Sequence, residues 1–533
     1  MKKVKKTATK PTFWATLQKN TIKFTKSDNF KYFLIYFALV FVAFCGLLNQ
    51  THICDNVLRM DKYDNMSLGE FMNEGTTSIN GRWGNIVFYL IHKPLSALGF
   101  TYNHNQWIYF LIDMIVIAIG LAILFSVFKK LINPSKKATV ALFLSVALIA
   151  INPFMVESLA FMIPSHPQTL LCVALAVYFL VSDKKRHFLW ATLFAIAAIC
   201  TYQSYYTHLF VLGLLALYLK NKGKLDKQLA LDALKNIGVI VAGMATYFIS
   251  VAVYCAVMGA EQAKGTSLSL SPIYLVKQLG HVVKLAAKEL IRGAGIYHLY
   301  GLLAIIFAAV VILLIVQLIR QHKTKTLVWG IVFIGVALVA PVAYGIISSS
   351  FYLAPRILIS YFAVMASFLI LTIYFKPVAK VVTATNIALV IFAAVNIFHC
   401  SSLITDIQIS NQIEFAEFNL IASEIKAYEE ASQQKIDTIV VFSSGHTGEV
   451  TFDQVHTNHP NGYLTSHLLQ HADWSNVSWL IRTTGEDYTH IEKSMGDDEF
   501  KELFPNYSSE QLTRFVPSER LKFDQNTLYW ITY

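Results

Sequence analysis

Eleven long apolar runs constrain the fold of this chain more than any other feature. Each is long enough, or nearly so, to cross about 30 Å of hydrocarbon as a helix. Of the 533 residues 55% are hydrophobic and 14% are charged, whereas soluble domains carry about 25% charged residues. We therefore predict a mainly α-helical, polytopic transmembrane bundle, in which 188–200 and 204–219 form either two spans or one broken hairpin. The runs are 32–48, 107–128, 138–152, 168–182, 188–200, 204–219, 236–258, 299–319, 326–348, 357–375 and 381–399.

The distribution of charge predicts how the chain is divided. Residues 401–533 hold 8 Lys and Arg against 20 Asp and Glu, and residues 1–400 hold 36 against 13. This asymmetry indicates an acidic soluble domain attached to a basic membrane body, and it argues against nucleic-acid binding. We predict a basic cytoplasmic N-terminus at 1–31, a transmembrane domain at 32–400 and a small α/β domain at 401–533.

Lysine and arginine are concentrated on one side of the predicted bundle. If the N-terminus is cytoplasmic, the inner segments carry 26 Lys and Arg and the outer segments carry 10, as the positive-inside rule requires. The loop 49–106 and the C-terminal domain then lie outside the membrane. No small-residue cleavage site follows the first apolar run, so we expect the N-terminus to remain as an anchor.

The C-terminal part has the composition of a small α/β unit. We predict a helix at Glu414–Ala431 and strands at Asp437–Phe442 and Thr527–Tyr533. His467 and His471 form an i,i+4 pair, but no glutamate flanks them, which makes a zinc site a weak interpretation. No cysteine pair has C-x-x-C spacing. We expect no cofactor, and the sequence leaves a need for a divalent metal open.

The loop 49–106 carries the strongest candidate catalytic residues. Asp55 follows the first apolar run, and Arg59 lies four residues later. A carboxylate there can accept a proton from an acceptor hydroxyl, and the planar donors of Arg59 and Arg82 suit a leaving phosphate. The alternatives are that Asp55 is a solvated residue at a helix end, and that Arg82 and Trp83 only anchor an interfacial helix.

Other polar residues fall on the same outer side, where groups at membrane depth are costly and tend to mark function. Glu157 is either an acid or acceptor-binding group, or a cap on a broken helix. Arg356 begins a late span and is a further candidate for the leaving phosphate. The remaining candidates, interpreted as substrate-binding, are Trp83, Asn152, His166, Tyr202 and Gln203.

Residues 274–292 form an amphipathic segment with apolar side chains on one stripe and basic side chains on the other. This pattern predicts an interfacial helix. Lys284 and Lys288 then have two interpretations. They either face lipid headgroups or bind the donor's phosphate.

The ordered motifs resemble those of the polytopic bacterial glucosyltransferases that modify O-antigen and related surface glycans, within the GT-C superfamily. The first outer loop of that family reads as an acidic pair, two residues and an arginine, and later Gly-Arg-(Trp/Pro). Asp55-Asn56-Val57-Leu58-Arg59 and Gly81-Arg82-Trp83 match, with Asn56 in place of the second acid. Asn152-Pro153 with Glu157, Tyr202-Gln203 and Pro355-Arg356 match later motifs, while the segment around His166 is less polar than in the family.

The resemblance implies a GT-C-like fold and an inverting glycosyltransferase that acts at the outer face of the bacterial inner membrane. The implied donor is a polyprenyl-phosphate-linked sugar, with glucose as the sugar of that family. The implied acceptor is a surface polysaccharide such as the O-antigen of lipopolysaccharide. The implied catalytic residues are Asp55 and Glu157.

Two other functions remain as alternatives. A glycan polymerase or ligase would share the chemistry and differ in its acceptor. A flippase or transporter of lipid-linked sugars would show an internal repeat and polar groups near the membrane midplane, whereas we find no repeat and Asp113 is the one acidic residue well inside a predicted span. No glycine-rich nucleotide-binding loop is evident in the inner segments, which disfavours a sugar-nucleotide donor.

Overall fold

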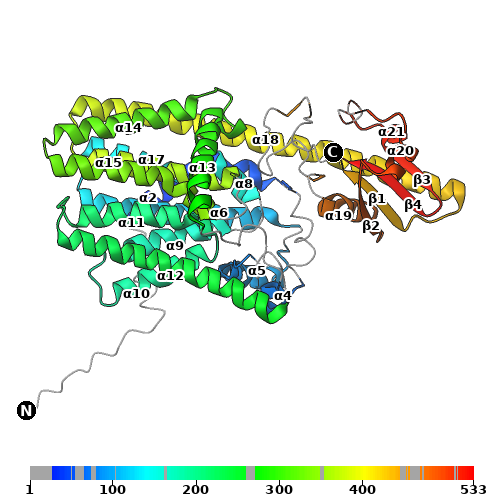
Figure 1. Ribbon diagram of the computed structural model, residues 1–533, viewed down its shortest axis with the longest axis horizontal. Helices are drawn as coiled ribbons and strands as arrows, with labels where there is room; N and C mark the ends of the chain where they lie inside the picture. Colours follow the sequence, from blue (N-terminus) through cyan, green and yellow to red (C-terminus); the bar gives the residue numbers. More distant parts are fainter. Residues whose placement is uncertain are drawn as a thin grey trace, which may run out of the picture.

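Figure 1 shows a computed structural model of the chain, in which a bundle of helices runs along one axis and a smaller α/β domain lies beyond one end. The predicted fold class, a mainly helical polytopic bundle with a small sheet in the C-terminal region, is confirmed. The structure describes residues 27–49, 51–53, 65–73, 80–101, 104–160, 165–259, 271–347, 353–443, 452, 454–455, 469–470, 473–508, 510, 512 and 514–532.

Each of the eleven predicted apolar runs contains a helix. Within the described ranges, seven helices are long and apolar enough to span a membrane, and the other four have 12 to 16 residues. The eleven helices are α2 (Asp28–Phe44), α6 (Gln106–Ile132), α7 (Lys136–Ala147), α9 (Ser165–Leu180), α10 (His187–Ile199), α11 (Tyr206–Lys220), α12 (Lys227–Met258), α14 (Leu302–Arg320), α15 (Thr324–Val339), α17 (Pro355–Tyr374) and α18 (Ala379–Ser432).

The helix α17 is the central helix of the bundle. It is buried along nearly its whole length, because α7, α8 (Phe154–Ala160), α11 and α14 all pack against it. The bundle is therefore one packed unit around α17.

Local capping fixes where α7 and α12 begin. The Ser135 side chain accepts the N–H of Ala138 at 3.4 Å, and Asp226 accepts the N–H of Leu229 at 3.0 Å.

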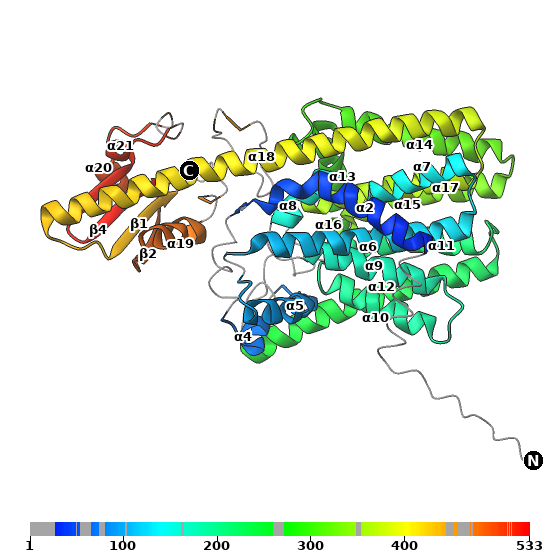
Figure 2. The same cartoon turned by 180° about the vertical axis from the view of Figure 1, so that it is seen from behind.

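The 54-residue helix α18 connects the bundle to the C-terminal domain. Figure 2 shows it running along the bundle and then across the face of the C-terminal sheet, a length of about 81 Å at 1.5 Å per residue. The predicted domain boundary at residue 400 lies inside this helix. On its C-terminal half, Glu414 accepts the backbone N–H of Leu469 at 3.0 Å and of Gln470 at 2.9 Å. The domain is thus held to α18 by charge-assisted hydrogen bonds.

The C-terminal domain contains a four-stranded sheet in the order β2-β1-β4-β3. The central β1 (Thr438–Ser443) pairs parallel with β2 (Thr489–Ser494) and with β4 (Thr527–Thr532), and β3 (Leu521–Asp524) pairs antiparallel with β4. The two strands predicted from the sequence are therefore both present. Trp479 of α19 (Asp473–Thr484) and Trp530 of β4 join the core that covers α18. The predicted histidine pair, His467 and His471, lies outside the described residues.

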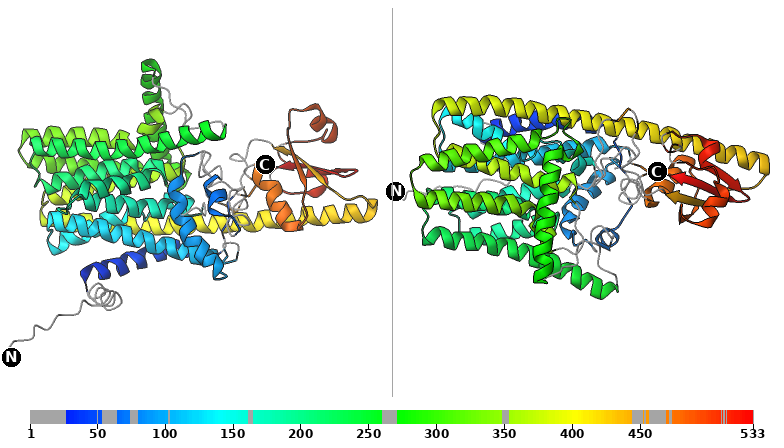
Figure 3. Two further views of the ribbon diagram at one scale, coloured as in Figure 1. Left: turned by 90° about the horizontal axis from the view of Figure 1, so that it is seen from below. Right: turned by 45° about the horizontal axis from the view of Figure 1, so that its top comes forward.

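The end of the bundle nearest the C-terminal domain is covered by short helices. Figure 3 shows α13 (Pro272–Arg292) lying across the bundle axis, beside the ends of the long helices. The short α4 (Leu68–Asn73) and α5 (Ile86–Ala97) lie at the same end (Figure 1). The described candidate residues are found at this end.

Candidate functional site

The candidate site is built from turns that connect the long helices, at the end of the bundle facing the C-terminal domain. Arg82 precedes the short helix η2 (Trp83–Asn85), Tyr202 precedes η3 (Gln203–Tyr205), and Arg356 is in the first turn of α17. His166 experiences the positive charges of both Arg82 and Arg356. These four residues lie between 36 and 274 positions apart in the sequence, so only the packing of the helices brings them together.

Two glycines place the Gly-Arg-Trp segment. Gly81 has φ +64°, which favours glycine, and a Cβ there would lie 2.8 Å from Cε2 of Tyr247 on α12. Gly84 donates its backbone N–H to the carbonyl of Cys200 at 3.0 Å, and a Cβ on Gly84 would lie 2.2 Å from Oγ1 of Thr201. The turn is thus fixed against α12 on one side and against the end of α10 on the other.

The guanidinium group of Arg82 lies beside the ring of Tyr202. Its Cζ lies 4.9 Å from the centre of the Tyr202 ring, a distance at which a cation is attracted to the face of an aromatic ring. Within the described part of the chain, no acid forms an ion pair with Arg82, and its buried Nε has no hydrogen-bond partner. This geometry leaves the positive charge available to an anion.

Aromatic and imidazole rings continue from Tyr202 into the bundle. The His166 ring centre lies 4.1 Å from that of Tyr202, and His166 Nδ1 lies 3.3 Å from the hydroxyl oxygen of Tyr205. Tyr205 in turn stacks on His208 at 4.3 Å. Gln203 donates from Nε2 to the hydroxyl of Tyr247 at 3.4 Å. The predicted substrate-binding residues His166, Tyr202 and Gln203 therefore belong to one layer of stacked and hydrogen-bonded rings.

Glu157 and Arg356 form a buried ion pair between α8 and α17. The distance from Arg356 Nη1 to Glu157 Oε1 is 2.5 Å, and the backbone N–H of Arg356 donates to Oε2 at 2.8 Å. The side chain of Arg356 is 8% exposed and that of Glu157 is 0% exposed. Glu157 therefore caps the start of α17 as well as neutralising Arg356. The cap suggested from the sequence was on the broken helix beside Asn152, whereas the observed contacts are with α17. The catalytic and phosphate-binding roles stay predictions.

Asn152 stabilises the break between α7 and α8. Its side-chain amide donates to the carbonyls of Leu148 at 3.1 Å and Ile149 at 3.4 Å, and these carbonyls belong to the turn that follows α7. Pro153 then precedes α8. The side chain thus satisfies backbone groups that the broken helix leaves free, and a role in binding substrate stays a prediction.

The two lysines predicted to bind phosphate lie on α13. Lys284 and Lys288 are exposed, whereas Val282, Ala286 and Glu289 face the bundle. The helix also exposes Ile273, Val276, Leu279 and Val283. Within the described ranges no contact joins either lysine to Arg82. The placement of α13 across the bundle fits an interfacial helix, and both interpretations of the lysines stay open.

Asp55 and Arg59 lie outside the described residues, and the chain leading to Asp55 is held at His52. The His52 N–H donates to Oδ1 of Asn411 at 2.7 Å, and the Asn411 side chain donates to the carbonyl of His52 at 2.9 Å. The His52 ring lies 5.1 Å from that of Trp479. Burial, assisted by the charge of Arg482, lowers the pKa of His52 to about 3. The chain therefore enters the loop that contains Asp55 from a neutral histidine fixed to α18 and to the C-terminal domain.

Two buried polar residues at the site were not singled out from the sequence. Neither ring nitrogen of His208 has a hydrogen-bond partner among the described residues, and the same holds for both side-chain polar atoms of Asn85. His208 is 0% exposed and Asn85 is 1% exposed. Unpaired buried polar groups are rare in proteins. The available signal was a lone histidine in the apolar run that follows Tyr202-Gln203, and an asparagine directly after Gly-Arg-Trp-Gly.

A comparison with protein families identifies the chain. The model described as "Glucosyl transferase GtrII" matches residues 44–374, which include every candidate residue named above. The chain belongs to the GtrII glucosyl transferase family. The comparison with curated proteins found no match. Membership in the GtrII family supports glucosyl transfer as the activity and makes the protein a glycosyltransferase with a sugar donor and a glycan acceptor.

Within the part of the chain that the structure describes, no group of three or more His, Cys, Asp or Glu is placed to hold a metal ion. Asp55, Asp61 and Asp64, in the loop between α2 and α6, lie outside that part. The described site thus offers arginine, aromatic and amide groups, which suit a phosphorylated sugar.

Proposed function

We propose that this GtrII-family protein transfers glucose from a polyprenyl-phosphate donor to a surface polysaccharide, with inversion, at the outer face of the bacterial inner membrane. The observation that supports this most directly is the guanidinium of Arg82, which forms no ion pair with any acid of the described residues and lies 4.9 Å from the centre of the Tyr202 ring at one end of an apolar bundle. A lipid-linked phosphate reaches such a position from the hydrocarbon, with its isoprenoid chain among the helices.

The proposed reaction is a single displacement. The carboxylate of Asp55 takes the proton of an acceptor hydroxyl, whose oxygen bonds to the anomeric carbon of glucose while the bond from that carbon to the phosphate oxygen breaks. The departing polyprenyl phosphate gains negative charge, and Arg82 stabilises that charge in a poorly solvated site. Most of the catalysis would come from positioning and charge stabilisation.

The aromatic layer supplies the proposed sugar site. Tyr202 and His166 present ring faces and edges next to Arg82, Trp83 directly follows Arg82 in the chain, and Gln203 and His208 supply amide and imidazole groups. A sugar carries both apolar C–H faces and hydroxyl groups, so a site of this composition suits it. The Glu157–Arg356 pair then holds α8 and α17, which support this layer.

The proposal is tested by mass spectrometry of surface glycans from cells that carry wild type, Arg82→Gln, Asp55→Asn or no copy of the gene. We expect wild type to add a hexose-sized mass that the deletion lacks. Arg82→Gln is expected to slow transfer by about 10²–10³-fold, as removal of one preorganised charge-stabilising donor does. Lys235→Gln, at the other end of the bundle, is the matched control and should transfer normally.

Two results would contradict the proposal. If both site variants are well expressed and glycosylate normally, neither residue has the proposed role. If the deletion leaves every glycan unchanged, a flippase or transporter becomes the better interpretation, and an effect on chain length in place of a hexose addition would indicate a polymerase or ligase. The orientation is tested separately by cysteine labelling in intact cells, where a cysteine at Glu486 should react with an impermeant maleimide and one at Lys185 should not.

A further inference from the structure

A groove with a volume of about 910 Å³ opens between α2, α6 and α9, at the end of the bundle opposite to Arg82. Its walls are largely apolar, and Lys130, Lys184 and Lys220 line its mouth. Lys130 and Lys220 lie at the C-terminal ends of α6 and α11, whereas the N-terminal ends of these helices adjoin His52 and Tyr205 on the site side. The groove is therefore separate from the candidate active site. The main apolar lining residues are Phe33, Ile119, Ile123, Val127, Tyr178 and Val181.

The length of the groove corresponds to one leaflet of a membrane. Ile119 and Leu131 of α6 both line it, and twelve residues of α-helix rise by about 18 Å. The hydrocarbon core of a bilayer is about 30 Å thick, so one leaflet contributes about half of that. A lipid chain aligned with α6 would fit the groove, with its headgroup at the lysine end.

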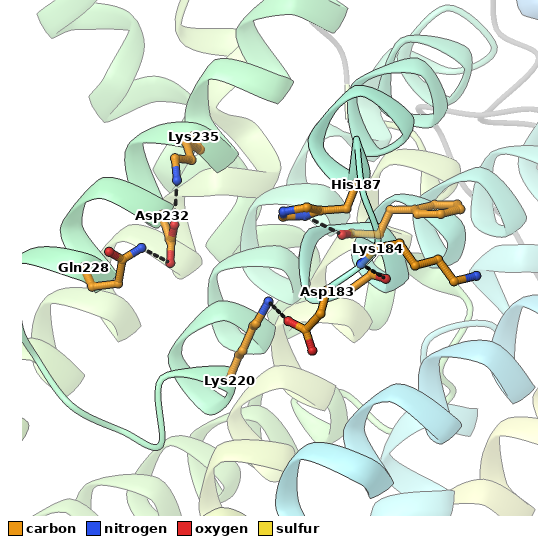
Figure 4. A network of polar contacts seen from close by, with 9 residues as sticks. Asp183, Lys184, His187, Lys220, Gln228, Asp232 and Lys235 are labelled. Carbon is orange, nitrogen blue, oxygen red and sulfur yellow. Dashed lines mark hydrogen bonds and ion pairs between the residues drawn. The ribbon is translucent and has the colours of Figure 1, made fainter.

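The charge at the mouth is positive and only partly compensated. Lys220 forms an ion pair with Asp183 at 3.0 Å, and this pair is shown in Figure 4. The side chain of Lys184 extends away from that pair (Figure 4) and lies 5.6 Å from the ring centre of Tyr178. Among the described residues, no acid pairs with Lys130 or Lys184. One acid against three lysines leaves a mouth with a net charge of about +2.

We propose that this groove binds one anionic phospholipid, with an acyl chain along α6 and its phosphate between Lys130 and Lys184. Arginine and lysine clusters between membrane helices at the inner leaflet attract anionic headgroups, and the apolar walls fit an acyl chain. The lipid would also cover the junction between α2 and α6, where Ser126 donates to Asn29 at 3.0 Å. Bound lipid should therefore stabilise this helix pair.

Two other occupants fit the same groove less well. The phosphate of a polyprenyl-phosphate donor would lie here at the wrong end of the bundle for reaction beside Arg82. The N-terminal segment 1–26 carries eight lysines and no acid, so its charge has the same sign as the mouth. Charge complementarity thus favours a phospholipid.

The test is native mass spectrometry of the full-length protein released from detergent with defined lipids. We compare phosphatidylglycerol with phosphatidylcholine of the same acyl chains, for wild type, Lys130→Gln/Lys184→Gln, Ile119→Trp and Lys235→Gln. Lys235 is the matched control, because it is an exposed lysine at the same end and pairs with Asp232 at 3.1 Å (Figure 4). It does not line the groove.

Wild type and Lys235→Gln should retain phosphatidylglycerol about 30-fold more strongly than phosphatidylcholine, since each of two lysines contributes about 1 kcal/mol to binding an anionic lipid. The double variant should lose that preference, and Ile119→Trp, which fills the groove, should reduce retention of both lipids. A thermal melt confirms that each variant is folded.

The proposal is overturned if wild type shows no preference, or if the double variant keeps it. It is also overturned if polyprenyl phosphate displaces phosphatidylglycerol with the same dependence on Lys130 and Lys184, since the groove would then be a donor site. If phosphatidylglycerol binds only after residues 1–26 are removed, that segment is the occupant and the proposal fails as well.

Discussion

Replacing Glu157 by alanine removes the acid that Arg356 contacts through its guanidinium group and its backbone N–H. Both side chains are buried, so the variant leaves a desolvated cation without its carboxylate. Removing one partner of a buried ion pair destabilises a protein by about 3–5 kcal/mol, of which the lost cap of α17 is expected to account for about 1 kcal/mol. We therefore expect Glu157→Ala to lower the free energy of unfolding by about 3–5 kcal/mol.

The assay is reversible unfolding in mixed micelles, applied to Glu157→Ala, Arg356→Met and the double variant. The double variant contains neither charge, so it should be about 2–3 kcal/mol less destabilised than the sum of the two single variants. Asp232→Ala, which breaks an ion pair with the exposed Lys235, is the control and should cost about 1 kcal/mol or less. Additive effects of the two single changes would refute the coupling that we infer between α8 and α17.

Three further predictions concern the same end of the bundle. Gly84→Ala should destabilise the protein by about 1–3 kcal/mol and reduce transfer, because the new Cβ would lie 2.2 Å from Thr201 Oγ1; a normal melting temperature and activity would contradict the account of this turn. Tyr202→Ala should weaken donor binding more than Tyr202→Phe, which keeps the ring beside Arg82, and equal KM values for the two variants would argue against the contact. Burial lowers the pKa of His52 from 6.5 to about 3, so below pH 6.5 the unfolded chain takes up a proton that the folded protein does not. The contribution of neutral His52 to stability is therefore present above pH 6.5 and falls by about 2 kcal/mol between pH 7 and pH 5. Unfolding curves of wild type and His52→Gln, measured across this pH range, isolate the contribution of His52 to the free energy of unfolding. If the two stabilities change with pH in parallel, His52 is not the source of the pH dependence.

The elements that follow from local sequence patterns were predictable. Each apolar run contains a helix, and the strands near Asp437 and Thr527 are present, because hydrophobic periodicity is a local signal. The Gly-Arg-Trp segment was singled out as a motif, but the positive φ of Gly81 that shapes it was not predicted.

The contacts that assemble the site were not predictable from the sequence. Glu157 and Arg356 are 199 residues apart, and no local pattern indicates that one caps the helix of the other. The domain boundary predicted from the charge shift near residue 400 lies inside α18, which is continuous from Ala379 to Ser432. Its apolar residues pack in the bundle and then, at Ile421 and Ile425, in the core of the C-terminal domain. His208 resembles an ordinary residue of an apolar run until Tyr205 and His166 are placed beside it.

The central claim is that the GtrII-family site uses a lipid-linked donor with Asp55 as the base. It is tested most directly with purified full-length protein in lipid nanodiscs, an isolated polysaccharide acceptor, and either polyprenyl-phosphate glucose or UDP-glucose as donor. We predict transfer of one glucose from the polyprenyl-phosphate donor by wild type, and none by a folded Asp55→Asn variant. Transfer from UDP-glucose, or undiminished transfer by Asp55→Asn, would contradict the account.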